Sequence, residues 1–349
     1  MREARVSPDL LIRRGTAADT DQILKLVKLS LGEGAIPRDR LYWNWKHHEN
    51  PFGESPILLA ESEGELVGLR VFMRWDWKSG SQTIRAVRAV DTATHPDWRG
   101  RGIFSRLTLA LVEQVREEGV HLVFNTPNDQ SRPGYLKMGW RAVGRTDLWI
   151  RPQRPISIAR ALLSRFRGSA EQNSQPVVHD GQLAGEVLSA KSNLASALLS
   201  ESERGADDRL SVHRDYEYLH WRYVSIPGIT YLAMAEVDRG EGAVVIYRLK
   251  KQGMLNEIRV CDIVAGPGKH SRKIARALLS RLRGSDGDYV SAMAASGTAE
   301  KRILLGAGFL PAPRLGPILT VLPLNQLPGA ADPLQRNSWR PTIGDMELF

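Results

Sequence analysis

The residues best suited to chemistry form the run Arg-Gly-Arg-Gly at positions 99–102. Glycines let a backbone approach a ligand closely, because no Cβ stands in the way. The successive amides of such a turn attract an anion, and the two arginines add positive charge for phosphate oxygens. The turn therefore predicts a binding site for a polyphosphate.

Three elements must hold this turn in place. Residues 87–94 and 120–124 read as strands. Between them, apolar residues recur every four positions, at Ile103, Leu107, Leu111 and Val115. That spacing predicts a helix with one apolar stripe, and Gly119 stands where its C-terminal cap is expected. The resulting βαβ pattern adds the positive end of a helix dipole to the turn.

The turn fits neither common phosphate loop. The pattern G-x-x-x-x-G-K-[ST] is absent, and G-x-G-x-x-G is incomplete because position 105 is Ser. The residues resemble the R-x-x-G-x-G/A loop of the GNAT acyltransferase superfamily: Arg99 and Gly102 match, whereas Phe104 departs from the final Gly or Ala and suggests a wider loop. Residues 135–140 (Tyr-Leu-Lys-Met-Gly-Trp) resemble the family's Y-x-K-x-G-F signature. The alternative is an ordinary βαβ unit with an arginine turn.

The resemblance implies acetyl-CoA as cosubstrate. The backbone of 92–94 would pair with the pantetheine arm and supply an oxyanion donor, and the amides of 101–105 would hold the pyrophosphate. Asn128 is either a hydrogen-bond donor to pantetheine or a turn residue. The residues implied in cofactor binding are Thr92, Ala93, Thr94, Arg99, Gly100, Arg101, Gly102, Ile103, Phe104, Ser105 and Asn128.

The resemblance also implies that Tyr135 protonates the departing thiolate, the alternative being a packed aromatic side chain. Two groups are candidates for the general base, besides His95, which precedes Pro96 and suits a turn better. Asp91 lies on the strand that enters the site, where burial would raise its pKa; alternatively, it is a structural carboxylate. The carboxylate of Phe349 is the second candidate, because some GNAT relatives use a chain terminus, although termini often fray.

Composition limits the functional classes. The chain has 349 residues and a net charge of +9, and its arginines are scattered without an aromatic-interleaved basic stripe, so no nucleic-acid partner is expected. A single cysteine, Cys261, and unpatterned histidines predict no metal site. No apolar run of about 18 residues and no signal peptide are visible. We therefore expect a cytoplasmic protein without a transmembrane segment; the oligomeric state stays open.

The second half of the sequence repeats the order of the first. Residues 218–222, followed by Pro227, match residues 42–46, followed by Pro51. We expect an α/β (α+β) fold of two tandem GNAT-like domains, each with a mixed, mostly antiparallel twisted sheet flanked by helices. The predicted boundaries are 9–150 for the domain with the acyl-CoA site, 151–176 for a basic linker, and 177–349 for a degenerate GNAT-like domain.

Three smaller features accompany the repeat. The second copy has Gly-Pro-Gly-Lys-His at 266–270 in place of the phosphate turn, and Leu304 in place of Tyr135. The helix predicted over 156–167 is basic and amphipathic, which suits packing on its own protein or, less often, a membrane surface. Trp43, Trp45, Trp75 and Trp77 either line an acceptor pocket or pack in the core.

Together these features predict an acyl-CoA-dependent N-acyltransferase that transfers an acetyl group to the amine of a small molecule such as an amino sugar. Two alternatives stay open. One is an aminoacyl or peptidyl transferase of the tandem-GNAT cell-wall type, although the nearly complete R-x-x-G-x-G loop favours coenzyme A. The other is a non-catalytic module that binds coenzyme A.

Overall fold

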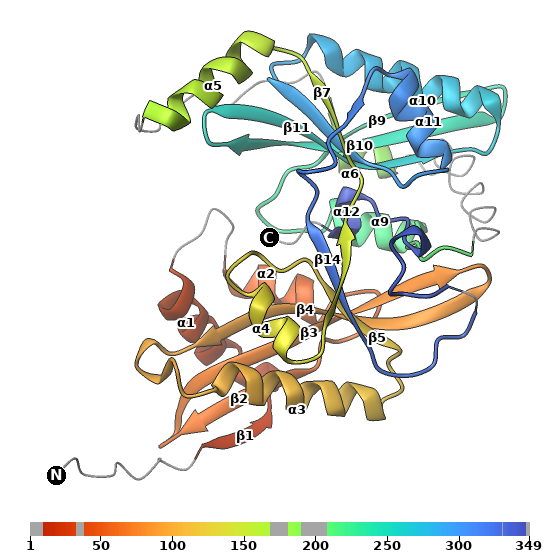
Figure 1. The fold of residues 1–349 in the computed structure, drawn as a ribbon. Coiled ribbons are helices and arrows are strands. Elements are labelled where there is room, and N and C mark those ends of the chain that lie inside the picture. Colours follow the sequence, from red (N-terminus) through yellow and green to blue (C-terminus); the bar gives the residue numbers. More distant parts are fainter. Residues whose placement is uncertain (1–9, 33–37, 168–180, 190–207, 330, 347–349) are drawn as a thin grey trace.

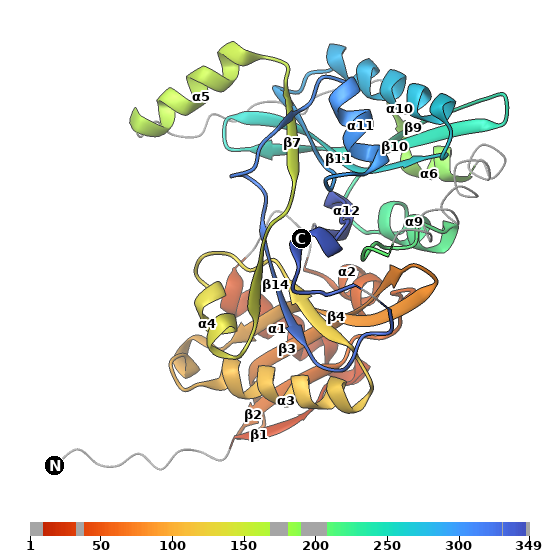
Figure 2. The same cartoon turned by 45° about the vertical axis from the view of Figure 1, so that its right-hand side comes forward.

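The computed structural model describes residues 10–32, 38–167, 181–189, 208–329 and 331–346 (Figure 1). They form two seven-stranded sheets with flanking helices, one unit above the other in Figures 1 and 2. This confirms the predicted α/β fold of two tandem GNAT-like units. None of the helices in these ranges is long and apolar enough to cross a membrane.

The first half supplies eleven main elements in chain order. They are β1 (Leu11–Arg14), α1 (Thr20–Leu31), α2 (Arg40–His47), β2 (Ile57–Ser62), β3 (Glu65–Ser79), β4 (Gln82–Thr94), α3 (Ile103–Glu117), β5 (Leu122–Asn125), α4 (Arg132–Lys137), β6 (Arg141–Arg145) and β7 (Leu148–Pro152).

The second half follows the same order after α5 (Pro155–Arg167). Its elements are β8 (Gln182–Leu183), α6 (Ala184–Ser189), α9 (Tyr216–Tyr223), β9 (Leu232–Asp238), β10 (Glu241–Gln252), β11 (Leu255–Ala265), α10 (Lys269–Arg281), β12 (Tyr289–Met293), α11 (Ala299–Gly306), β13 (Leu310–Pro311), β14 (Ile318–Pro323) and α12 (Ile343–Met346).

The two sheets exchange one strand. The first has the order β1-β2-β3-β4-β5-β14-β6 and the second, read from β8, the order β8-β9-β10-β11-β12-β7-β13. Thus β7 pairs with β12 in the second sheet, and β14 lies between β5 and β6 in the first. Figure 2 shows both crossings between the units. Sheet membership therefore does not follow the predicted domain ranges. Within the predicted linker, 151–152 end β7, 155–167 form α5, and 168–176 lie outside the described residues.

An aromatic core joins the two units through reciprocal contacts of two tryptophans. Trp45 on α2 and Trp221 on α9 stack with ring centroids 5.0 Å apart. The indole nitrogen of each donates to the backbone oxygen of the other, at 2.8 and 2.9 Å. Trp43, Trp75 and Trp77 are also buried in this core. The tryptophans therefore pack the core, and this buried contact holds the two units in one arrangement.

The helix that follows the phosphate turn packs on the sheet through its apolar stripe. Ile103, Leu107, Leu111 and Val115 are 0–2% exposed and lie in the apolar cluster that α3 forms with the sheet. Gly119 follows the helix with φ +76°, as its predicted capping position requires. The predicted apolar stripe is confirmed, and it places the N-terminus of α3 beside the end of β4.

Candidate active site between β4, α3 and α4

The turn before α3 leaves backbone amides available. Gly100 and Gly102 have φ +77° and +74°, and a Cβ at either position would meet nothing within 4 Å, so their conformation and not crowding requires glycine. The first helical hydrogen bond runs from the amide of Arg106 to the oxygen of Gly102. The three amides of residues 103–105 thus have no intrahelical acceptor, and no side chain caps the helix. Such a helix start favours an anion.

The two arginines of the turn have neighbours of their own. The guanidinium of Arg99 donates to the backbone oxygen of Ser30, at 2.9 Å, and the hydroxyl of Ser30 donates to the oxygen of Thr94, at 3.0 Å. Arg101 lies over the ring of Trp98, at 4.5 Å. Arg99 therefore ties the last turn of α1 to the phosphate turn, and its predicted contact with phosphate stays a prediction.

Next to this turn, β4 separates from β5. The two strands pair in parallel only between 86–88 and 122–124. Among the described residues, no strand pairs with 89–94 on the β5 side. A bulge at Asp91 separates the pairs Arg70–Thr92 and Val71–Val90. The predicted pantetheine-binding stretch therefore lies on an open strand edge that can hydrogen-bond an extended ligand.

Tyr135 lies beside this edge, on α4. Its side chain is 5% exposed and packs against the rings of Phe104 and Trp140, at 5.7 and 5.2 Å between centroids. Its hydroxyl accepts a hydrogen bond from the guanidinium of Arg70, at 2.8 Å. Arg70 was not among the residues predicted from the sequence. The available signal was one arginine inside the apolar strand 66–73.

The expectation that Asp91 has a raised pKa is wrong. Burial alone would raise it, but the ammonium of Lys46, at 2.7 Å, and the imidazole of His47, at 2.9 Å, outweigh burial and hold the pKa of Asp91 well below its usual range. Both partners come from the end of α2, and their side chains are 3% and 0% exposed. Asp91 is therefore an ionised carboxylate and a poor proton acceptor.

His47 is held in one protonation state. Burial lowers its pKa, so the neutral imidazole is favoured at pH 7. Because Asp91 only accepts, the Nε2 atom of His47 carries the proton, and Nδ1 accepts from the hydroxyl of Ser55, at 3.0 Å. The sequence pattern did not single out Lys46 or His47, which meet Asp91 only through the fold.

We expect Asp91→Asn to destabilise the protein by about 3 kcal/mol at pH 7, because it leaves the buried Lys46 ammonium without its counter-charge. A carboxylate whose pKa is lowered in the folded state stabilises the fold above its unfolded pKa of about 3.9 and loses this effect as the pH falls below that value. The difference in the free energy of unfolding between wild type and Asp91→Asn should therefore become smaller below about pH 4. Urea unfolding at pH 7, 5 and 3.5 measures this difference.

Asp76→Asn is the matched control. Asp76 lies on β3, and burial raises its pKa, so its charge opposes folding at neutral pH. We expect this variant to be as stable as the wild type or more stable at pH 7. Equal destabilisation by both variants at every pH would contradict the pairing of Asp91 with Lys46.

Two other predicted residues are only partly placed. The side-chain oxygen of Asn128 accepts from the amide and the hydroxyl of Ser131, both at 2.9 Å, so its turn-forming role is confirmed. Its contact with pantetheine stays a prediction. Phe349 lies outside the described residues. The described chain ends at Met346, whose backbone oxygen accepts from the guanidinium of Arg88 on β4, at 2.6 Å.

At the equivalent helix start in the second unit, a side-chain carboxylate of the same chain accepts hydrogen bonds at the helix N-terminus. The carboxylate of Glu241 accepts from the amide and the hydroxyl of Ser271 at the N-terminus of α10, at 2.8 and 2.9 Å. A Cβ on Gly268 would lie 2.0 Å from this carboxylate. Glu241 thus occupies the place that an anion takes at such a helix start. Leu304, on α11, is buried and offers no hydroxyl.

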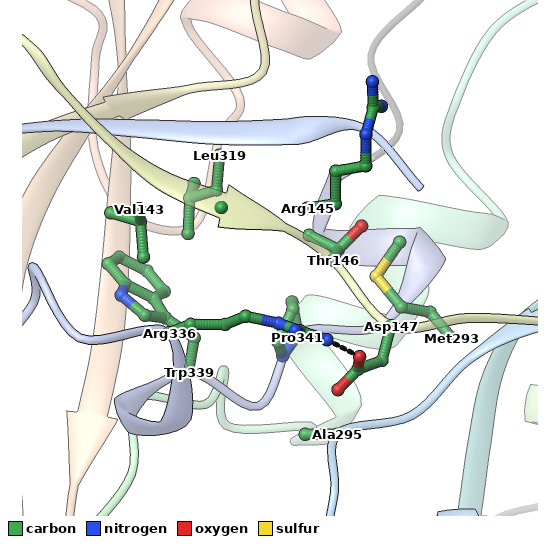
Figure 3. A pocket seen from close by; sticks show the side chains of 11 residues that line it. Val143, Arg145, Thr146, Asp147, Met293, Ala295, Leu319, Arg336, Trp339 and Pro341 are labelled. Atoms are coloured by element: carbon green, nitrogen blue, oxygen red, sulfur yellow. Dashed lines mark ion pairs between the residues drawn. The ribbon is translucent and has the colours of Figure 1, made fainter. Parts of the chain in front are cut away.

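A separate pocket lies where β6 leads into β7. Val143, Leu319 and Trp339 contribute apolar walls, and an ion pair between Arg336 and Asp147 crosses it (Figure 3). Its volume is about 320 Å³ including its opening to solvent. None of the residues predicted for catalysis or cofactor binding lines it.

Comparisons with known proteins agree with this geometry. Residues 11–143 match the family model of the acetyltransferase (GNAT) domain. A curated N-alpha-acetyltransferase of Sulfurisphaera tokodaii is 27% identical over 150 residues, which cover 40% of this chain and 86% of that protein.

Two solved structures resemble nearly the whole chain. A GCN5-related N-acetyltransferase from Anabaena variabilis has a TM-score of 0.63 at 14% identity, with 91% of this chain and 73% of the other covered. A probable N-acyltransferase from Enterococcus faecalis has a TM-score of 0.62 at 11% identity, with 90% and 73% covered. At these identities the likeness concerns the fold, and it extends over both sheets.

Proposed function

We propose that this chain, in which residues 11–143 match the family model of the acetyltransferase (GNAT) domain, transfers the acetyl group of acetyl-CoA to a primary amine of a small molecule. One observation carries the proposal. The start of α3, the edge of β4 and Tyr135 are joined by direct contacts: Phe104, in the first turn of α3, packs on the ring of Tyr135, and Arg70 donates to both the Tyr135 hydroxyl and the oxygen of Val90 on β4.

The described residues fit coenzyme A in two places. The amides of 103–105 and the open space before Gly100 and Gly102 suit the pyrophosphate. The edge of β4 at 92–94 suits the pantetheine arm, and the side-chain nitrogen of Asn128, whose oxygen is used locally, is a candidate donor to it. When bound, acetyl-CoA supplies an activated acyl group.

The chemistry we propose is direct transfer. The acceptor's ammonium group loses one proton to solvent, and its free amine nitrogen attacks the thioester carbon; the surplus proton on nitrogen leaves to solvent as the amide forms. A backbone amide on the edge of β4 donates to the carbonyl oxygen as negative charge develops there. The C–S bond then breaks with its electron pair on sulfur. Tyr135 gives this sulfur its phenolic proton as the negative charge develops there.

Asp91 receives a different role from the one expected. One of its oxygens, Oδ2, is bound by Lys46 and His47, and in the part of the chain that the structure describes Oδ1 has no partner. The side chain is 26% exposed. We assign this ionised carboxylate to binding the acceptor's ammonium group beside the open edge of β4 and not to a base with a raised pKa.

A thiol-release assay over a panel of amines tests the function. The panel holds amino sugars, peptides with free α-amines and polyamines, each matched with an analogue that has a hydroxyl in place of the amine. We expect release with at least one amine class and none with its hydroxyl analogue. The α-amine arm follows the name of the Sulfurisphaera tokodaii relative.

The alternatives give different results in the same assay. An aminoacyl transferase would release no thiol and would instead consume aminoacyl-tRNA. A non-catalytic module would bind acetyl-CoA and release no thiol with any amine. Either result would overturn the proposed acetyl transfer.

A further inference from the structure

We propose that Arg70 is a positioning residue that directs the hydroxyl of Tyr135 toward the leaving thiolate and stabilises the phenolate formed when the proton is transferred. The inference rests on the proposed function, in which Tyr135 is the acid. It concerns a residue that neither motif of the sequence contains.

Arg70 is a buried cation without an acidic partner. It lies on β3, is 0% exposed, and among the described residues its guanidinium donates only to neutral oxygens. These are the Tyr135 hydroxyl, at 2.8 Å, and the backbone oxygen of Val90, at 3.2 Å. Its Nε atom is buried without an acceptor. Burial of an uncompensated charge is unfavourable, so a group that becomes negative during the reaction is the natural partner.

Three aromatic rings enclose this guanidinium. Its central carbon lies 4.9 Å from the centroid of Phe72, 5.5 Å from Phe104 and 5.4 Å from Tyr135. Ring faces attract a cation that has lost its water. Phe104 is the residue that departs from the R-x-x-G-x-G/A pattern, and its ring is almost perpendicular to that of Tyr135. The departure therefore supplies one wall of the enclosure around Arg70.

The direction of the hydrogen bond fixes the direction of the proton. A guanidinium has only donors, so the oxygen of Tyr135 is the acceptor and its own O–H must point elsewhere. The open edge of β4 lies beside it. As the C–S bond breaks, the sulfur takes the electron pair and then the proton of Tyr135. The products at this point are a free thiol and a phenolate that accepts a charge-assisted hydrogen bond from Arg70. Solvent later returns the proton.

The same guanidinium connects the acid to the acceptor side of the site. Its second contact is the oxygen of Val90, the residue immediately before the bulge at Asp91. One side chain thus holds Tyr135 and the strand edge in a common geometry. A shift of either group would disturb the register of the reactants.

A double-mutant cycle tests the inference on the full chain. We expect Arg70→Met to lower kcat for thiol release by about 10- to 100-fold in the wild-type background, the effect of removing a hydrogen bond to a charged group. In the Tyr135→Phe background the same change should lower kcat clearly less, since only the contact of Arg70 with the oxygen of Val90 is then lost. The dissociation constant of acetyl-CoA should be unchanged in all three variants.

Two further variants guard against a folding defect. Arg70→Lys keeps the positive charge and loses the two-pronged donor geometry of the guanidinium, so we expect a kcat between those of the wild type and Arg70→Met. If Arg70→Met does not fold, Arg70→Lys takes its place in the cycle. Arg151→Met is the matched control, because Arg151 is a buried arginine of the second sheet that donates to two backbone oxygens and lies over Phe309. It should lower the melting temperature and leave kcat unchanged.

The outcomes separate the two levels of the proposal. Equal fold-losses from the Arg70 change in both backgrounds would overturn the positioning role and leave the acid assignment intact. Full kcat in Tyr135→Phe alone would overturn the acid assignment and, with it, the role of Arg70.

Discussion

Replacing Gly102 with glutamate is expected to weaken acetyl-CoA binding by on the order of 100-fold or more. Two effects add. Gly102 has φ +74°, which an L-residue adopts only with strain of about 1–2 kcal/mol. The new carboxylate would also stand at the helix start proposed for the pyrophosphate, where like charge costs several kcal/mol. Calorimetric titration measures the affinity.

The control is a glycine of the same conformation on the other sheet. Gly253, in the turn between β10 and β11, has φ +59° and open space around it. Gly253→Glu should carry similar strain without changing the affinity. The titration should also give one acetyl-CoA per chain, because Glu241 fills the second helix start. The proposed binding site would be contradicted if Gly102→Glu bound acetyl-CoA within threefold of the wild-type affinity, or if the wild type bound two molecules of acetyl-CoA per chain.

Replacing Tyr135 with phenylalanine is expected to lower kcat for thiol release by about 10²- to 10⁴-fold, the usual contribution of a general acid. Affinity for acetyl-CoA should stay within about twofold, because the lost hydroxyl faces Arg70 and the leaving group and not the phosphate turn. The measurement pairs single-turnover thiol release with calorimetry on the same preparations.

Tyr289→Phe is the comparison for this variant. Tyr289 lies on β12 in the second sheet, where burial raises its pKa to about 12, and it takes no part in the proposed chemistry. Its kcat should equal that of the wild type. If Tyr135→Phe were equally active, the thiolate would leave without protein assistance, and the buried hydroxyl would be structural.

The two halves of the chain contribute differently to the proposed site. The proposed active site lies in the first half, and the sheet of that half contains β14 from the second half, which pairs with β5 and β6. The second unit keeps the fold and fills its own helix start with Glu241. We infer that its contribution is structural: it supplies a strand and the aromatic contact at Trp221.

Local sequence was sufficient for the central βαβ unit. The four-residue spacing from Ile103 to Val115 specifies a helix face, and the glycines at 100 and 102 meet the positive φ angles that their turn requires. Such features depend on neighbours in sequence, because a helix period and a backbone conformation are decided within a few residues. The repeat of the element order was visible for the same reason.

The sequence did not predict which side chains contact the charged groups of the site. His47 meets Asp91 across 44 residues, and Arg70 meets Tyr135 across 65. The direction of the Asp91 pKa shift depends on which charge lies beside it, and burial by itself predicts the opposite direction. Distances of this kind are set by the packing of α2 and α4 on the sheet and leave no mark on the local pattern.

The strand exchange shows the same limit most clearly. β7 and β14 are short strands, and each lies between two strands of the other half of the chain. Their period describes which face is buried and not which sheet receives them. The sequence thus determined the glycine turn, the helix behind it and the placement of Tyr135 after them. Only the tertiary structure decided that Arg70 binds that tyrosine, that Asp91 is ionised, and that the first sheet contains a strand from the other half, because each depends on contacts between residues far apart in the chain.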